Sequence, residues 1–303
     1  VASVLREKAA LHTLQPHEYI ASLLATFQDV RSLFLVLQLG LGGDLRGSIL
    51  RERRRSIVSG SGGMAEGSVC FYAAVLVLVL QHIHGRGLVY RDLKPENVLL
   101  DAEGQPLLCD FGTAVHLGEA GRSMSTLGTW EYAPPEMLRS LGVTCAADWW
   151  SLGVIVLECL LGDTPFPSGD DDSPAAVLSS ISAFDAQELP TSLSPEAQAL
   201  VGMLLQVDEQ KRWAASRRVR EQSFFANTDW ELLARREVAP PYRPILLGAA
   251  DTRNFSHCSL DESDAKRVGA PLSASPEWGG GVAAFGGEDR REEEWHHSCW
   301  DDF

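Results

Sequence analysis

The sequence has few of the patterns that mark several common protein classes. Its 303 residues include six cysteines, which are scattered and never form a Cys-x-x-Cys pair. This spacing indicates neither a zinc site nor a disulfide framework, and reduced thiols are the simplest interpretation. The N-terminus shows no basic segment followed by an apolar one, so we expect no secretory signal and a cytoplasmic location.

Long apolar runs and basic residues are also scarce. The longest apolar run, FYAAVLVLVL at residues 71–80, has about half the length that a bilayer span requires, so we expect no membrane span. Acidic residues number 41 against 26 basic ones, which gives a formal net charge of −15. A nucleic-acid-binding protein needs a basic face to displace counterions. The charge balance therefore argues against nucleic acid and favours partners that carry Arg or Lys.

The residues that are present predict a folded chain of one large domain or two smaller ones. Apolar residues make up 45% and charged residues 22%, which is typical of a globular protein. From about residue 227 the chain is rich in Pro, Gly, Asp and Glu, which indicates a tail and not a second core. Periodicity and turn residues predict these elements: a helix at 1–14, a buried strand and turn at 32–40, a flexible surface loop at 51–68, a buried helix at 69–87, a strand–turn–strand unit at 98–112, a helix buried all round at 146–162, and helices at 194–207 and near 214–223.

The segment YRDLKPENVLLDAEGQPLLCDFGTA, residues 90–114, holds the side chains that phosphoryl transfer needs. This reaction depends on alignment and charge neutralisation more than on covalent help from the protein. Asp92 can position an attacking hydroxyl and accept its proton, and Lys94 can neutralise the migrating phosphoryl group. Asn97 and Asp110 offer the amide and carboxylate oxygens that bind Mg²⁺.

This run resembles the catalytic loop and the Asp-Phe-Gly motif of the eukaryotic protein kinases. GTWEYAPPE (128–136), ADWWSLG (147–153) and Lys211-Arg212 extend the resemblance, and Lys-Pro-Glu-Asn after Arg-Asp is the Ser/Thr form. The resemblance implies an α+β, bilobal kinase fold and ATP-dependent phosphorylation of Ser/Thr in proteins, with ATP and Mg²⁺ as cofactors. A non-catalytic pseudokinase or scaffold module is the alternative. A small-molecule phosphotransferase is disfavoured because the peptide-docking segment at 128–136 is present.

The resemblance also implies roles for individual residues. Asp92 is the implied base, Lys94 the phosphate-stabilising lysine, and Glu7 the helix glutamate that pairs with a strand lysine. Leu37 and Leu99 could equally be plain core residues. The implied ATP-binding residues are Leu37, Gln38, Leu39, Gly40, Asp44, Leu99 and Cys109, the implied metal ligands are Asn97 and Asp110, and the implied packing spine consists of Leu11, Leu23, Tyr90 and Phe111.

Substrate recognition is implied by three acids and one threonine. Asp44, Glu96 and Glu158 match the acids that receive arginines upstream of the phosphoacceptor, by charge-assisted hydrogen bonds. Ordinary surface acids are the alternative. Thr129 is a further implied substrate-binding residue. The implied partners are proteins with basic residues near the target Ser or Thr.

Other matched positions are structural or regulatory. Glu136 is implied to pair with Arg212, and Asp148 to hold the backbone of the catalytic loop. Arg91 would receive the phosphate of an activation-segment residue, for which Ser125 is the implied site. The sequence departs from the family pattern at three positions. Val115 stands where a lysine commonly helps Arg91 to receive the phosphate, and Trp130 and Pro134 replace small residues in the peptide-docking segment.

Further segments resemble a narrower group. GGDL (42–45) and FFANTDWELLARREVAPPYRP (224–244) resemble the AGC kinases, and DTRNF (251–255) with the final CWDDF resembles the cGMP-dependent kinases most. Cyclic-nucleotide-binding domains upstream are therefore possible partners. The implied division is a catalytic domain at 1–226, with a partial small lobe at 1–39 and a large lobe at 40–226, followed by a tail at 227–303.

One part of the expected kinase machinery is missing from the sequence. No Gly-x-Gly-x-x-Gly loop occurs anywhere, and the lysine that should pair with Glu7 would lie further upstream than the chain extends. We therefore expect an N-terminally truncated kinase fragment that begins inside the helix of Glu7. The arginine-rich stretch 51–55 is expected to be a solvated loop, with a regulatory contact as the alternative.

Overall fold

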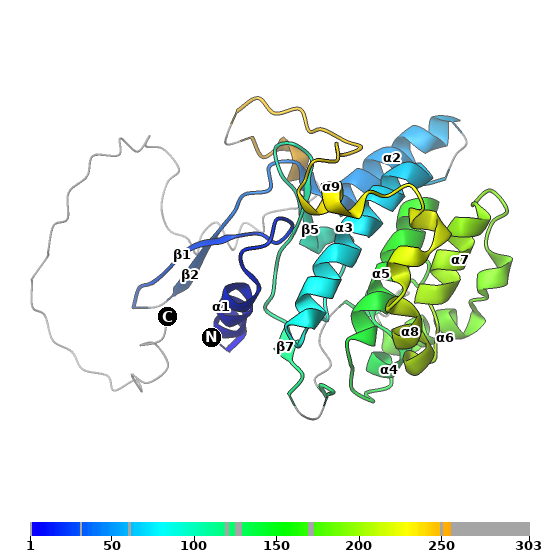
Figure 1. Cartoon of the computed structure of the whole chain (residues 1–303), viewed down its shortest axis with the longest axis horizontal. Coiled ribbons are helices and arrows are strands. Elements are labelled where there is room, and N and C mark those ends of the chain that lie inside the picture. Colours follow the sequence, from blue (N-terminus) through cyan, green and yellow to red (C-terminus); the bar gives the residue numbers. More distant parts are fainter. Residues whose placement is uncertain are drawn as a thin grey trace, which may run out of the picture. The chain divides into compact units, whose positions relative to one another are not determined.

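The computed structural model describes residues 2–30, 32–59, 62–118, 121–124, 129–168, 173–248 and 251–255 (Figure 1). This part of the chain is an α+β structure in which helices dominate and the sheets have two or three strands. The helices are α1 (Ala2–Leu14), α2 (Leu45–Ser59), α3 (Glu66–Gly85), α4 (Pro135–Leu138), α5 (Ala146–Leu161), α6 (Pro174–Ala183), α7 (Pro195–Leu204), α8 (Glu209–Ser216) and α9 (Trp230–Ala234). The strands are β1 (Leu23–Gln28), β2 (Leu33–Leu37), β3 (Gly43–Asp44), β4 (Leu88–Val89), β5 (Val98–Leu100), β6 (Pro106–Leu108) and β7 (Val115–His116).

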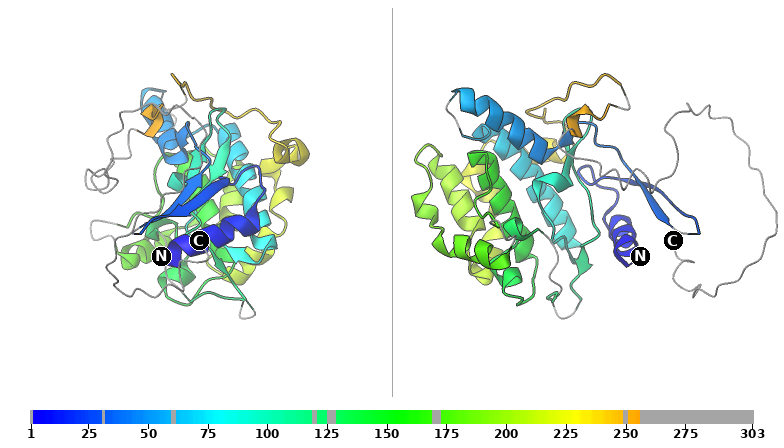
Figure 2. Two further views of the ribbon diagram at one scale, coloured as in Figure 1. Left: turned by 90° about the vertical axis from the view of Figure 1, so that its left-hand side faces the viewer. Right: turned by 180° about the vertical axis from the view of Figure 1, so that it is seen from behind.

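Helix α5 is the centre of the helical part of the molecule. Its sequence is apolar on nearly every side, and all residues from Ala146 to Leu160 are buried. Helices α3, α7 and α8 pack against it, as both sets of views show (Figures 1 and 2). Gly162 ends the helix at a φ of 82°, a left-handed conformation that glycine adopts without a Cβ clash. The predicted helix at 146–162 is confirmed.

Helix α3 is the other long apolar element. By length and composition it could cross a membrane. Its side chains between Val69 and Ile83 are nevertheless mostly buried, and it packs on α5. Its apolar surface is therefore part of the protein core, and the predicted buried helix at 69–87 is confirmed.

The N-terminal part of the described chain is one helix and one hairpin. Helix α1 confirms the helix predicted at 1–14, and its Leu11 and Leu14 are buried. Strands β1 and β2 pair in antiparallel register, and β2 confirms a strand within 32–40. Its predicted burial is wrong, because all five residues of β2 are half-buried or exposed in this two-stranded sheet. The rings of Phe27 and Phe34 stack across this hairpin with centroids 4.7 Å apart.

The strand–turn–strand unit predicted at 98–112 is also present. Strands β5 and β6 pair in antiparallel register, and Asp101 closes the turn by accepting a hydrogen bond from the Gln105 backbone N–H at 2.9 Å. Gly104 in this turn has a φ of 92°, and a Cβ there would lie 1.9 Å from the carbonyl oxygen of Tyr242. Only glycine fits, because of both its backbone conformation and the close approach of the tail.

The prediction of a flexible surface loop at 51–68 is wrong. Helix α2 continues through this segment to Ser59, and α3 begins at Glu66. Arg and Glu are good helix formers, and Arg55 pairs with Glu52 one turn earlier at 2.6 Å. The run of basic residues therefore favours a solvated helix over a loop, and the glycines shape only the short connection to α3.

The helix predicted near 214–223 lies earlier in the chain. The side chain of Asp208 accepts hydrogen bonds from the backbone N–H groups of Gln210 and Lys211, which starts α8 at Glu209. This N-terminal cap satisfies donors that the helix leaves unpaired. The helix at 194–207 is confirmed as α7.

The described part of the tail packs on the domain, and residues up to Phe255 belong to one compact unit. Leu233 in α9 is buried, and its carbonyl oxygen accepts a hydrogen bond from the Tyr19 hydroxyl at 2.6 Å. Further along, Arg236 pairs with Asp101 on the β5–β6 turn. Residues 256–303, with the final CWDDF, lie outside the described residues. The division at 39 and 226 stays a prediction.

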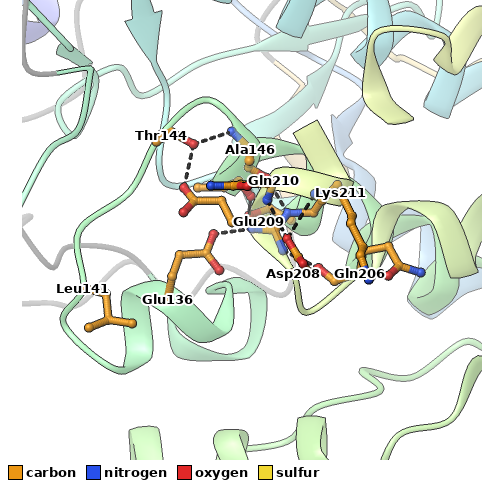
Figure 3. Close-up of polar contacts among 12 residues, drawn as sticks. Glu136, Leu141, Thr144, Ala146, Gln206, Asp208, Glu209, Gln210 and Lys211 are labelled. Atoms are coloured by element: carbon orange, nitrogen blue, oxygen red, sulfur yellow. Dashed lines mark hydrogen bonds and ion pairs between the residues drawn. The ribbon is translucent and has the colours of Figure 1, made fainter. Parts of the chain in front are cut away.

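A buried ion pair joins α4 to α8. Arg212 is fully buried, and it pairs with Glu136 while its Nε donates to the Ala146 carbonyl oxygen at 2.8 Å. Burial lowers the pKa of Arg212 and raises that of Glu136, against their mutual attraction. Beside this pair, the Thr144 hydroxyl donates to Glu209 at 2.6 Å (Figure 3). The network ties α4 and the residues at the start of α5 to α8.

Breaking this pair should be costly, because a buried charge would lose its partner. Arg212→Ala should lower the free energy of unfolding by about 3–5 kcal/mol. The exposed Arg218→Ala, which removes a surface pair with Glu221, should leave the urea midpoint almost unchanged. Equal midpoints for the two variants would contradict a structural role for the buried pair.

Candidate active site

A buried carboxylate shapes the catalytic loop. Asp148 in α5 accepts hydrogen bonds from the backbone N–H groups of Tyr90 at 3.0 Å and Arg91 at 2.8 Å. The Nε2 of His84 lies 2.7 Å from the same carboxylate. Arg91 has a φ of 72°, which is uncommon for a side-chain-bearing residue and is held here by these contacts. The loop therefore presents Asp92 from a fixed backbone.

Asp92, Lys94 and Thr129 form a compact polar cluster. The Nζ of Lys94 lies 3.0 Å from Oδ2 of Asp92 and donates to the Thr129 hydroxyl at 2.9 Å. The Thr129 backbone N–H and hydroxyl lie 3.2 and 3.3 Å from Oδ1 of Asp92. A carboxylate, a cation and a hydroxyl thus converge from two separate loops.

Asn97 connects this cluster to the Asp-Phe-Gly segment. Its Nδ2 donates to the Asp92 carbonyl oxygen at 2.8 Å and to Oδ2 of Asp92 at 3.2 Å. Its own carbonyl oxygen accepts a hydrogen bond from the Cys109 backbone N–H at 3.0 Å. Because the amide nitrogen faces Asp92, the amide oxygen Oδ1 is the atom that remains for a cation.

Asp110 is exposed and has a φ of 55°, so its carboxylate is presented from a left-handed turn. Glu7 in α1 accepts a hydrogen bond from the Phe111 backbone N–H. Burial, followed by the charge of Asp110, raises the pKa of Glu7 above its usual value. The structure thus places Glu7 next to the Asp-Phe-Gly segment, and its implied pairing with a strand lysine stays a prediction.

The four residues of the implied spine lie in the packed interior. The rings of Tyr90 and Phe111 meet edge to face with centroids 5.1 Å apart. Leu11 is buried in the same core cluster, and Leu23 packs against it. These contacts connect α1 to the catalytic loop through apolar packing.

The donor atoms of this site suit magnesium bound together with phosphates. In the stretches that the structure describes, no three His, Cys, Asp or Glu residues converge as a self-sufficient metal site. Mg²⁺ usually takes one or two protein oxygens and completes its shell with phosphate oxygens and waters. Asn97 and Asp110 fit that requirement. Bound ATP with Mg²⁺ would supply the phosphoryl group and neutralise its charge.

Two of the implied nucleotide-facing residues are in direct contact. A Cβ on Gly40 would lie 2.7 Å from Cβ of Leu99, so the backbone at Gly40 lies directly against that leucine. The backbone N–H of Gln38 donates to the Ser22 carbonyl oxygen at 2.8 Å, which fixes the connecting segment after β2. Leu37 pairs with Leu23 across the β1–β2 hairpin.

Other implied nucleotide residues have distinct surroundings. Burial raises the pKa of Cys109 to about 12, so this thiol stays neutral. Leu39 is 62% exposed. Asp44 is buried, and its Oδ1 accepts a hydrogen bond from the Gly47 backbone N–H at 2.7 Å, which caps the start of α2.

The implied substrate acids Glu96 and Glu158 meet through a residue that the sequence did not single out. Arg46 in α2 forms ion pairs with both carboxylates. The hydroxyl of Tyr132 donates to the other oxygen of Glu158 at 2.7 Å. The only sequence signal for this contact is the position of Arg46 in GGDLRG, directly after the segment that supplies Asp44.

Arg91 reaches the activation segment. Its Nε donates to the Thr113 carbonyl oxygen at 2.8 Å, and its Nη1 donates to the Ser123 hydroxyl at 3.0 Å. Ser125, the implied phosphosite, lies outside the described residues and stays a prediction. Ser123 is the hydroxyl that the described part of the segment brings to Arg91.

Comparison with known proteins identifies the class. A family model described as protein kinase domain matches residues 2–225, so the chain belongs to the protein kinase family, and the expected fold is confirmed. The chain is 36% identical over 264 residues to ribosomal protein S6 kinase alpha-3 of mouse and of human, which covers 86% of this chain and 34% of each relative.

Two further relatives are protein kinases by name, and one of them is named a serine/threonine-protein kinase. A probable serine/threonine-protein kinase of Dictyostelium discoideum is 33% identical over 280 residues, with 91% of this chain and 58% of that protein covered. Protein kinase C delta type of rat is 33% identical over 264 residues, with 86% and 37% covered. The chain thus spans between about a third and three fifths of the length of these relatives.

The environment of Glu7 predicts a pH-dependent stability. Burial and Asp110 raise the pKa of Glu7, so the folded chain binds a proton at Glu7 more readily than the unfolded chain does. The contribution of Glu7 to the free energy of unfolding therefore becomes unfavourable as the pH rises through the raised pKa. Glu7→Gln should therefore raise the melting temperature of the 303-residue chain by about 1–3 °C at pH 7 and by little near pH 4.

Thermal unfolding between pH 4 and pH 8 measures this effect. Glu103→Gln is the matched control, because Glu103 is exposed on the β5–β6 turn. A melting temperature for Glu7→Gln that falls below that of the native chain at pH 7 would show that the charge of Glu7 stabilises the fold.

Proposed function

We propose that this protein transfers the terminal phosphoryl group of ATP to Ser or Thr hydroxyls of protein substrates. The observation that supports this most is the cluster of Asp92, Lys94 and Thr129, to which Asn97 is hydrogen-bonded. Membership of the protein kinase family and the Ser/Thr kinase relatives support the same reaction.

Each residue of the cluster has a distinct task in this proposal. The Asp92 carboxylate accepts the proton of the attacking hydroxyl, and its orientation is held by Lys94, Thr129 and Asn97. The Lys94 ammonium lies where it can stabilise negative charge that develops on the transferred group. Asn97 and Asp110 hold Mg²⁺ through oxygen atoms. Thr129 joins the substrate-facing segment to the base.

The nucleotide is proposed to lie between the connecting segment after β2 and the β5–β6 hairpin. The contact of Gly40 with Leu99 supports this position, because it brings the connecting segment and the hairpin together. The remaining residues of this proposal are Leu37, Gln38, Asp44 and Cys109.

The finer classification is also a proposal. GGDL at 42–45 and the segment 224–244 support membership of the AGC group, with a likeness to the cGMP-dependent kinases and to their upstream cyclic-nucleotide-binding domains. Glu96, exposed two residues after Lys94, and the formal net charge of −15 support substrates with Arg or Lys near the target hydroxyl. The scattered cysteines support a cytoplasmic location.

Phosphoryl transfer is proposed for a longer natural form of the protein. The 303 residues contain no Gly-x-Gly-x-x-Gly loop, and Glu7 has no strand lysine in this sequence to pair with. Because alignment of the phosphates provides most of the catalysis, the 303-residue chain alone should transfer no measurable phosphate, although it can still bind Mg²⁺ with ATP weakly.

The role of Asp92 can be tested in a natural form that includes a glycine-rich loop. Asp92→Asn should lower turnover of a basic peptide by about 100-fold or more, the scale for loss of a positioned proton acceptor. Binding of ATP should persist, because Asn97 and Asp110 remain. Radiolabelled phosphate transfer and nucleotide-binding titrations measure the two effects separately.

Asp163→Asn is the matched control, since Asp163 is an exposed aspartate that pairs with Arg53 away from the cluster. It should leave turnover unchanged. Near-normal peptide phosphorylation by Asp92→Asn would rule out its role as base. Absence of transfer by the native long form, with ATP binding intact, would support a non-catalytic binding module instead.

A further inference from the structure

A guanidinium group of the chain itself occupies the acid pair near the catalytic cluster. Arg46, at the start of α2, pairs with Glu158 through Nη1, and its Nε lies 3.8 Å from Oε1 of Glu96. Glu158 is completely buried, and its second carboxylate oxygen accepts the Tyr132 hydroxyl at 2.7 Å. Both oxygens of the buried acid therefore already have partners inside the protein.

One acid of this pair, and the tyrosine that binds the other, lie next to residues of the reaction site. Glu96 follows Lys94 by two residues, and Tyr132 follows Thr129 by three. Lys94 and Thr129 both contact Asp92. A substrate segment whose hydroxyl reaches Asp92 therefore passes close to the acid pair, and a long cationic side chain near that hydroxyl could reach it.

The burial of each member decides how the pair can exchange partners. The side chain of Glu158 is 0% exposed, that of Arg46 is 29% exposed, and that of Glu96 is 43% exposed. Leaving a buried carboxylate without a cation is strongly unfavourable, so Arg46 can leave only if another cation replaces it. A substrate arginine that displaced Arg46 would replace one ion pair to Glu158 with an equal one, so it would add little to the binding free energy.

Resting on the proposed function, we propose that Arg46 is a specificity-determining residue. Its guanidinium group fills the position between Glu96 and Glu158 that a substrate arginine would otherwise occupy. The enzyme therefore does not select arginine at the substrate position that enters there. Two acids face one arginine, so one negative charge remains, on the exposed side at Glu96. A basic substrate residue meets that charge through an exposed and weakly favourable pair. Removal of Arg46 would turn the pocket into an arginine-selective one.

Peptide binding to the 303-residue chain tests this role. The probes are a fluorescein-labelled peptide with two arginines before an alanine that replaces the target serine, and two versions in which one of these arginines is replaced by citrulline, its uncharged counterpart. By fluorescence anisotropy, citrulline at the position that enters between Glu96 and Glu158 should change the Kd of the native chain by no more than about 3-fold. Arg46→Ala and Arg46→Gln should each prefer arginine at that position by about 10- to 100-fold.

Three controls separate specificity from stability. Arg53→Ala removes an arginine from the same helix, where it pairs with the exposed Asp163, and should behave as the native chain. The double variant Arg46→Gln with Glu158→Gln should lose the gained preference. Circular dichroism and thermal unfolding identify folded variants. If Arg46→Ala does not fold, Arg46→Gln serves instead, because its shorter, uncharged side chain keeps a hydrogen-bond donor near Glu158 but leaves the acid pair without a cation.

The outcomes distinguish this inference from the proposed function. Peptide binding needs neither ATP nor Asp92, so the gained preference should also appear when Asp92→Asn is added. A gained preference without phosphoryl transfer in the long form would refute the proposed function alone. A folded Arg46→Gln variant with a preference of no more than about 3-fold would overturn the role of Arg46, as would a native chain that already prefers arginine about 10-fold.

Discussion

The two carboxylate oxygens of Asp148 hold the backbone on which the reaction site is built. The residue is fully buried in α5, the most deeply buried helix, and it fixes two consecutive N–H groups of the catalytic loop. Asp92, Lys94 and Asn97 all follow this anchored turn. Because the helix is packed on several sides, the loop takes its position from the core and not from its own short sequence. A strained φ at Arg91 is tolerated for the same reason.

Much of the fold could be predicted from the sequence, because the strongest patterns reflect burial. The apolar faces of α3 and α5 and the short strands around the β5–β6 turn give signals that packing reinforces. Segment 51–59 could not be predicted as a helix, since its arginines have no apolar periodicity and the glycines that follow indicate a loop. The start of α8 depends on a cap at Asp208, which is a local hydrogen-bond pattern without a hydrophobic signal.

The sequence predicts which residues belong to the site, but it does not predict which distant residues contact them. Asp92, Lys94 and Asn97 are close in the sequence, so their convergence is expected. The approach of Thr129 and of Glu7 depends on how two distant segments fold back onto the catalytic loop. Apart from its position directly after GGDL, Arg46 had no signal as a partner of Glu158, because an arginine on a polar helix is indistinguishable in sequence from one that faces water.

The glycine in the β5–β6 turn links two segments that are far apart in the chain. Since a side chain at residue 104 would collide with the backbone at Tyr242, the turn and the tail can change only together. Among descendants of this protein, a lineage that lost or rerouted the tail would be released from the clash but not from the left-handed backbone conformation at residue 104. Asn or Asp, which tolerate positive φ better than other side chains, would be the first replacements for glycine there.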